Sequence, residues 1–206
     1  MKNNQVKLVG IVAKELKELY SFDKEKFFGT TICVKRHSGT EDKLAVIIPS
    51  MIATGIEQGM TVEVTGSFRS RNVYDGNVRH KELYVFADSI EVVDDAASHM
   101  NEITLNGFVT NPPIYRETPL GREITDLCVA VNRDTTTKAD YINCITWGRN
   151  ARNARDLSVG TNLLLTGRIQ SREYSKKLSE DKFETRTAYE VSIVSMAEIG
   201  GKNEKN

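Results

Sequence analysis

Aromatic and cationic side chains gather in the second half of the chain, on segments whose alternating pattern predicts β-strands. Tyr141 and Trp147 are six positions apart, and Tyr174 ends a later segment that carries Arg168 and Arg172. Residues separated by an even number of positions share one side of a strand. Aromatic rings stack on flat π systems, and guanidinium groups pair with phosphate oxygens. The spacing therefore predicts a surface that stacks rings and binds anions.

Further cations extend this candidate surface. Lys176 and Lys177 follow Tyr174 in a polar hairpin, and Arg149 begins a cluster with Arg152 and Arg155 that could equally be the solvated side of a helix. Trp147 could be a core residue as readily as a platform, and we expect Phe108 and Tyr189 in the core. The residues predicted to contact a polyanionic ligand are Tyr141, Trp147, Tyr174, Arg168, Arg172, Lys176, Lys177, Arg149, Arg69, Arg71 and Tyr74.

Residue types suited to catalysis are scattered. The three histidines, His37, His80 and His99, form no metal-binding or triad pattern, and there is no nucleophile elbow or phosphate-binding loop. Three cysteines sit outside any metal-ligand spacing and are predicted to be structural. We expect neither enzymatic activity, nor a metal, nor a cofactor.

Composition is that of an ordinary globular protein, with 39% hydrophobic and 27% charged residues. No apolar run approaches the roughly 20 residues that span a bilayer, and the first residues lack a signal-peptide pattern. We therefore expect a cytoplasmic protein without a membrane partner. The formal net charge is zero, so an anionic ligand would meet local patches rather than a basic surface.

The chain repeats itself at an offset of 101 residues. Residues 59–71, GMTVEVTGSFRSR, return as residues 160–172, GTNLLLTGRIQSR, with five of thirteen positions identical. An offset of about half the chain exceeds the period of solenoid repeats and predicts two copies of one domain. The predicted boundaries are a first domain over 1–95, a linker over 96–101, a second domain over 102–200 and a disordered tail over 201–206.

Strand signals follow the same order in both copies. The predicted strands are Val6–Val12, Phe27–Arg36, Leu44–Ile48, Thr61–Arg71 and Leu83–Val93, then Ile103–Val109, Glu123–Arg133, Tyr141–Trp147, Thr161–Tyr174 and Phe183–Ile199. A short helix is expected between the third and fourth strands of each copy. This layout predicts an all-β chain with two tandem oligonucleotide/oligosaccharide-binding (OB) folds, each a five-stranded Greek-key barrel.

The second copy resembles the bacterial single-stranded DNA-binding protein family. The resemblance rests on Ile103–Gly107, Ala139–Gly148 and Val159–Tyr174. It implies stacking aromatics at Tyr141, Trp147 and Tyr174, and basic residues such as Arg168 and Arg172 on the DNA backbone. A further aromatic of the family is absent from residues 132–136, and the first copy, which has no aromatic in residues 44–48, matches more faintly.

The resemblance implies sequence-tolerant binding and protection of single-stranded DNA in replication, recombination or repair. Family members work with four OB domains, so a homodimer is expected. The tail has no acidic run and no apolar tip, so recruitment of replication proteins through an acidic tail is not expected. The alternative is an accessory primosome-type protein whose OB domains bind mainly protein. The remaining alternative is an OB-fold enzyme or an RNA binder. A nuclease assay with added metal would detect the enzyme, and a comparison of oligo-dT with oligo-U binding would detect the RNA binder.

Overall fold

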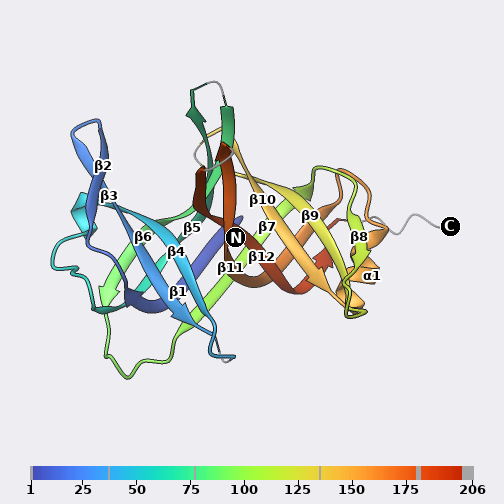
Figure 1. Ribbon diagram of the computed structural model, residues 1–206, viewed down its shortest axis with the longest axis horizontal. Coiled ribbons are helices and arrows are strands. Elements are labelled where there is room, and N and C mark those ends of the chain that lie inside the picture. The colour runs from blue at the N-terminus through green and yellow to red at the C-terminus, as the bar shows by residue number, and fades with distance from the viewer. Residues whose placement is uncertain (1, 37, 77, 135, 180–181, 201–206) are drawn as a thin grey trace.

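The computed structural model describes residues 2–36, 38–76, 78–134, 136–179 and 182–200. This part of the chain is built almost entirely of strands, in two halves that lie side by side along the long axis of the molecule (Figure 1). The predicted tail, residues 201–206, lies outside the described residues. Within the described residues, no helix has the length and apolar character needed to cross a membrane.

The first half closes five of its strands into a ring. β1 pairs with β3 and β5, β3 with β4, β4 in parallel with β6, and β6 with β5. The elements of this half are β1 (Asn4–Val12), β2 (Lys17–Phe22), β3 (Glu25–Lys35), β4 (Glu41–Pro49), the 3₁₀ helix η1 (Ser50–Ile52), β5 (Thr61–Asp75) and β6 (Val78–Val92).

The second half closes in the same order. β7 pairs with β9 and β11, β9 with β10, β10 in parallel with β12, and β12 with β11. Its elements are β7 (Met100–Val109), β8 (Ile114–Glu117), β9 (Glu123–Asn132), β10 (Ala139–Trp147), the helix α1 (Arg149–Arg155), β11 (Asn162–Ser179) and β12 (Lys182–Glu198). Met100 and Asn101, which the predicted linker includes, already belong to β7.

Alternation along the strands fills each ring with apolar side chains. In β11 the side chains of Leu163, Leu165 and Ile169 are fully buried, as are Val62, Val64 and Phe68 at the equivalent places in β5. The repeated Thr-Gly pair marks a β-bulge in both strands. A Cβ on Gly66 or Gly167 would overlap the carbonyl of the neighbouring strand, which explains why glycine stands there twice.

Two short strands depart from the five-strand prediction. β2 pairs with β3 and β8 pairs with β9, each at an outer edge of the sheet. All six residues of β2 are exposed, so this strand carries no apolar alternation for a sequence pattern to detect.

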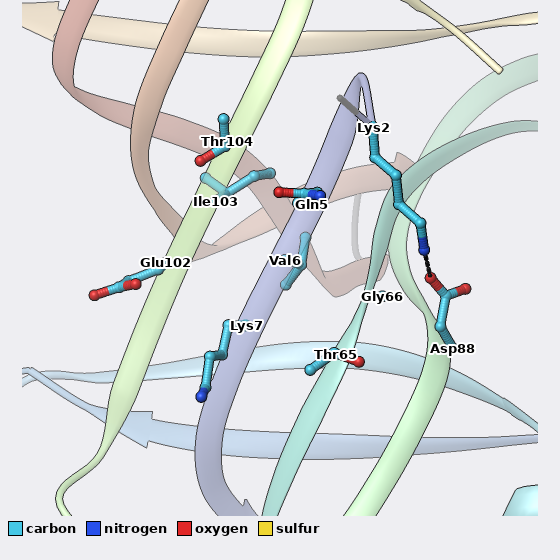
Figure 2. A pocket seen from close by; sticks show the side chains of 10 residues that line it. All are labelled: Lys2, Gln5, Val6, Lys7, Thr65, Gly66, Asp88, Glu102, Ile103 and Thr104. Atoms are coloured by element: carbon cyan, nitrogen blue, oxygen red, sulfur yellow. Dashed lines mark hydrogen bonds and ion pairs between the residues drawn. The ribbon is translucent and has the colours of Figure 1, made fainter. Parts of the chain in front are cut away.

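One ladder joins the two rings into a continuous sheet. β1 and β7 pair antiparallel from Asn4 opposite Leu105 to Val9 opposite Met100. A shallow groove of about 380 Å³ lies beside this ladder, with Lys2 donating a hydrogen bond to Asp88 at its edge (Figure 2). The ten described residues that line it include no aromatic side chain, so it does not match the predicted stacking surface.

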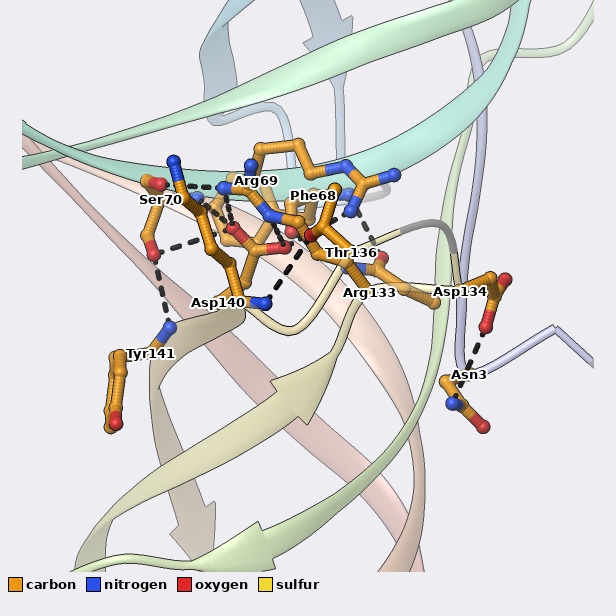
Figure 3. Close-up of polar contacts among 11 residues, drawn as sticks. Asn3, Phe68, Arg69, Ser70, Arg133, Asp134, Thr136, Asp140 and Tyr141 are labelled. Carbon is orange, nitrogen blue, oxygen red and sulfur yellow. Dashed lines mark hydrogen bonds and ion pairs between the residues drawn. The ribbon is translucent and has the colours of Figure 1, made fainter.

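Buried carboxylates hold each long hairpin against the other half. Asp140 on β10 accepts hydrogen bonds from Arg133 (Nη2, 2.6 Å), from Arg69 (Nη1, 3.2 Å) and from the backbone N–H of Ser70 (2.7 Å) on β5 (Figure 3). In the matching arrangement, Asp42 on β4 accepts from Arg36 (Nε, 2.7 Å) and from the backbone N–H of Ser171 (2.9 Å) on β11. The two halves are therefore docked by equivalent contacts.

Candidate nucleic-acid interface

Strand β10 presents the two aromatics that its spacing predicts. The side chains of Tyr141 and Trp147 are 50% and 41% exposed, while Ile142 and Cys144, on the opposite side of the strand, are buried. The strand ends at Trp147 because Gly148 turns the chain with a φ of 55° into α1. Both aromatic side chains are therefore available on the outer surface of the second half.

Phe108 adds a third aromatic to this side, where the sequence predicted a core residue. It is 42% exposed and pairs with Ala130, which also pairs with Tyr141. Directly paired residues point to the same side of a sheet, so Phe108, Ala130 and Tyr141 form one row across three strands. The expectation of a buried Phe108 is wrong, because the alternation Gly107-Phe108-Val109 places the two flanking residues inside.

Strand β11 runs five residues past its predicted end at Tyr174 and carries the next part of the surface. Tyr174 is 40% exposed and pairs with Arg186 of β12. Arg172 is exposed and Lys176 half-buried, and neither forms an ion pair with the described residues. The side chain of Lys177 lies outside the described part of the structure.

Arg168 and Arg69 lie at the junction between the halves, contrary to the expectation of an open cationic face. Arg168 is half-buried, and its Nε has no hydrogen-bond partner among the described residues. Burial, followed by the nearby charge of Arg36, lowers the pKa of its guanidinium. Arg69 pairs with Asp140, whose side chain is 1% exposed. Both arginines are thus placed against the other half.

The remaining predicted residues of the first half stand outside this junction. Tyr74 is 67% exposed near the tip of the β5–β6 hairpin. Arg71 pairs with Glu82 (Nη2 to Oε2, 2.8 Å), and its Cζ lies 5.4 Å from the ring centroid of Tyr84. Tyr84 carries no signal in the sequence, because its contact with Arg71 forms only once β5 and β6 are placed in register.

The arginines of α1 divide into paired and unpaired side chains. Arg152 forms an ion pair with Glu123, and Arg155 pairs with Asp156 (Nε to Oδ1, 3.2 Å) while lying over the ring of Tyr115. Arg149 is exposed and forms no ion pair with the described residues. The solvated-helix interpretation therefore holds for two members of the cluster, and Arg149 alone is free to meet an anion.

The junction also orients the start of β10. The hydroxyl of Ser70 accepts a hydrogen bond from the backbone N–H of Tyr141 at 3.0 Å, and the carboxylate of Asp140 holds Arg133 and Ser70 beside it (Figure 3). Arg133 belongs to residues 132–136, the segment without the further aromatic that the resemblance led us to look for. Here that segment docks the first half, and Tyr141 is held by contacts from both halves.

Two of the three cysteines, Cys33 and Cys144, lie where a structural role is expected. Cys144 is buried and Cys33 half-buried, and burial raises the pKa of both thiols. A raised pKa keeps a thiol protonated and unreactive. Among the described residues, no group of three or more His, Cys, Asp or Glu side chains is arranged to hold a metal ion.

Comparison with known proteins supports the resemblance predicted from the sequence. Residues 100–197 match the model of the "Single-strand binding protein family". Single-stranded DNA-binding protein A of Bacillus subtilis is 37% identical over 92 residues, covering 42% of this chain and 54% of that protein. The single-stranded DNA-binding protein of Thermus thermophilus is 26% identical over 148 residues, covering 64% of this chain and 56% of that protein. The chain thus spans about half the length of these curated relatives.

The fold matches over nearly the whole chain. The crystal structure of the single-stranded DNA binding protein from Thermus aquaticus aligns with a TM-score of 0.75 and 22% sequence identity, covering 95% of this chain and 92% of that chain. At this identity the likeness concerns the fold, and it includes the first half, which the family model does not reach.

Proposed function

We propose that this protein, whose residues 100–197 match the model of the Single-strand binding protein family, binds and protects single-stranded DNA without sequence preference. The binding serves replication, recombination or repair. The observation that carries the proposal is the exposed aromatic surface of β10, with Tyr141 and Trp147 on one side of the strand. An aromatic platform beside cations is the arrangement that single-strand binders use, because every base has a π-face.

In the proposed mechanism, bases stack on Tyr141, Trp147 and Tyr174, and phosphates pair with Arg172 and Lys176. Each stacked base contributes about 1–3 kcal/mol, so a few rings dominate the affinity. Arg149 and Lys177 extend the cationic edge, and Phe108 adds a ring in the same row as Tyr141, with Ala130 between them. We assign Arg168 and Arg69 to the junction between the halves rather than to phosphate binding.

We further propose that each half is an OB domain, the first over residues 1–95 and the second over 102–200. The matching ring of pairings in the two halves supports this division. Two chains would supply four OB domains, so the proposed assembly is a homodimer. Mass measurement in solution tests this assembly, and the expected mass is twice the chain mass of 23.1 kDa. A monomer at micromolar concentration would contradict the homodimer but not the proposed DNA binding.

The proposed function is tested by binding labelled oligonucleotides and following their anisotropy at low salt. Oligo-dT is expected to bind, and a duplex of mixed sequence is expected to bind much more weakly. Binding of oligo-U shows whether the protein distinguishes RNA from DNA. Failure to bind oligo-dT, together with capture of a replication protein, would instead favour the accessory primosome role.

A further inference from the structure

A second groove, which adjoins the exposed side of β10, lies between the long hairpins of the two halves. It has a volume of about 710 Å³ and is lined by residues of both halves. We call it the inter-hairpin groove and define it by Lys14, Leu19, Arg71, Tyr84, Tyr174 and Tyr189. Its volume falls in the range of sites that hold small organic ligands.

Aromatic rings with a cation above one of them line the inter-hairpin groove. Arg71 lies over the ring of Tyr84, with Cζ 5.4 Å from the centroid. Burial raises the pKa of the Tyr84 phenol, so this ring is neutral at physiological pH. Tyr174, from the other half, stands in the same groove with 40% of its surface exposed. A base entering here would meet a ring from each half and a guanidinium, which itself stacks on π systems.

The charge of the groove suits a phosphate backbone. Among its described lining residues, five are Lys or Arg (Lys14, Lys17, Arg71, Lys81 and Arg186) and three are Glu (Glu15, Glu82 and Glu184). Arg71 and Arg186 are each paired with a glutamate, which holds their side chains in place. The positive excess is local, in a chain whose formal net charge is zero.

The groove is continuous with the aromatic side of β10. Asn143, which lies between Tyr141 and Trp147 on the same side of that strand, also lines the groove. Lys81 of the first half donates hydrogen bonds to the backbone carbonyl of Tyr141 (3.1 Å) and to Oδ1 of Asn143 (2.9 Å). A strand stacked on Tyr141 would therefore reach the groove without leaving the protein surface.

We propose that the inter-hairpin groove is a second single-strand subsite, which the DNA bound on β10 enters and in which a base stacks on the exposed guanidinium of Arg71, itself supported by the ring of Tyr84. This inference rests on the proposed function. It gives the first half a direct part in binding, although β4 has Lys43 and Ala45 at the places where β10 has Tyr141 and Asn143. The aromatics come instead from β6 and from the hairpin of the other half.

The test compares two lengths of oligo-dT, because only a long strand can occupy both subsites. An oligomer of about 8 nucleotides fits one OB-sized site, and one of about 30 spans two. Binding of the short oligomer is followed by the fluorescence of Trp147, which reports on β10. Tyr84→Leu is expected to weaken binding of the long oligomer about 5- to 150-fold and to leave the short one unchanged. Tyr84→Phe, which keeps the ring, is expected to bind both like the natural protein.

Two further variants separate a lost contact from a damaged fold. Arg71→Gln changes an exposed side chain and is expected to weaken the long oligomer alone. Tyr115→Leu disrupts a similar arginine–tyrosine contact, with Arg155, outside the groove and is expected to change neither affinity. Urea unfolding midpoints show whether each variant is folded.

If Tyr84→Leu and the natural protein bind the long oligomer with equal affinity, the groove is not a DNA subsite, and the proposal of binding on β10 is unaffected. Failure of the natural protein to bind either oligomer would overturn the proposed function itself. Capture of a peptide in the groove, with no effect of Tyr84→Leu on DNA, would identify a protein-docking surface instead.

Discussion

At the scale of single residues, exposure decides which predicted side chains can meet DNA. Tyr141, Trp147 and Tyr174 keep two-fifths to one-half of their surface exposed, and the opposite side of β10, which carries the first two, is buried. Arg168 shares the alternation of Arg172 but faces the other half, because the halves dock over that part of β11. The pattern of one strand predicts the side on which a residue lies, and it contains no information on what covers that side.

Replacing Tyr141 by Ala is expected to weaken oligo-dT binding about 5- to 150-fold, since one stacked base contributes about 1–3 kcal/mol. Phe108→Ala is expected to have a smaller effect in the same direction, because Phe108 lies two strands from Tyr141 at the edge of the row. Anisotropy titration at constant salt measures both. Affinities equal to that of the natural protein for both variants would show that this row is not the binding surface.

Arg172→Gln is expected to remove one phosphate contact. Binding of single strands falls with salt by about 0.7 in log K per log salt for each phosphate neutralised. The slope should therefore decrease in magnitude by about 0.7, uniformly across oligonucleotide sequences. Titrations at several salt concentrations give the slope. Arg116→Gln, on β8 and paired with Asp126, serves as the control and is expected to leave it unchanged.

At the scale of elements, buried strands were predictable and exposed ones were not. The predicted strand Tyr141–Trp147 is confirmed as part of β10. The repeated Thr-Gly pair lies at equivalent bulges in β5 and β11, which the sequence did not predict. Ile142 and Cys144 supply the alternation that made β10 visible. β2, with every residue exposed, supplies none. The signal that could have revealed the junction is Asp140, a charged residue at a core-facing position of β10.

Removing the carboxylate of Asp140 is expected to destabilise the fold strongly. Asp140→Ala leaves Arg133 and Arg69 without their shared partner in a buried site, which typically costs about 3–5 kcal/mol. Asp126→Ala breaks an exposed ion pair with Arg116 and is expected to cost about 0–1 kcal/mol. Urea unfolding measures both. Equal losses would contradict a buried junction held by Asp140.

At the scale of the whole molecule, the two similar halves contribute unequally to the proposed DNA-binding surface. The β1–β7 ladder and the two buried aspartates lock them into a single body, and the first half lends Ser70 and Lys81 to the strand that carries Tyr141. The duplication was visible in the sequence. The repeat does not indicate how the two copies dock. It therefore could not predict which strands pair between them or which hairpin contacts the other half.

The central claim is that single-stranded DNA stacks on β10, and Trp147 reports on it directly because it is the only tryptophan of the chain. Oligo-dT is titrated at low salt while the fluorescence of Trp147 is followed, and salt is then added to reverse the change. The expected result is saturable quenching that salt reverses. Absence of both quenching and binding at low salt would contradict the claim.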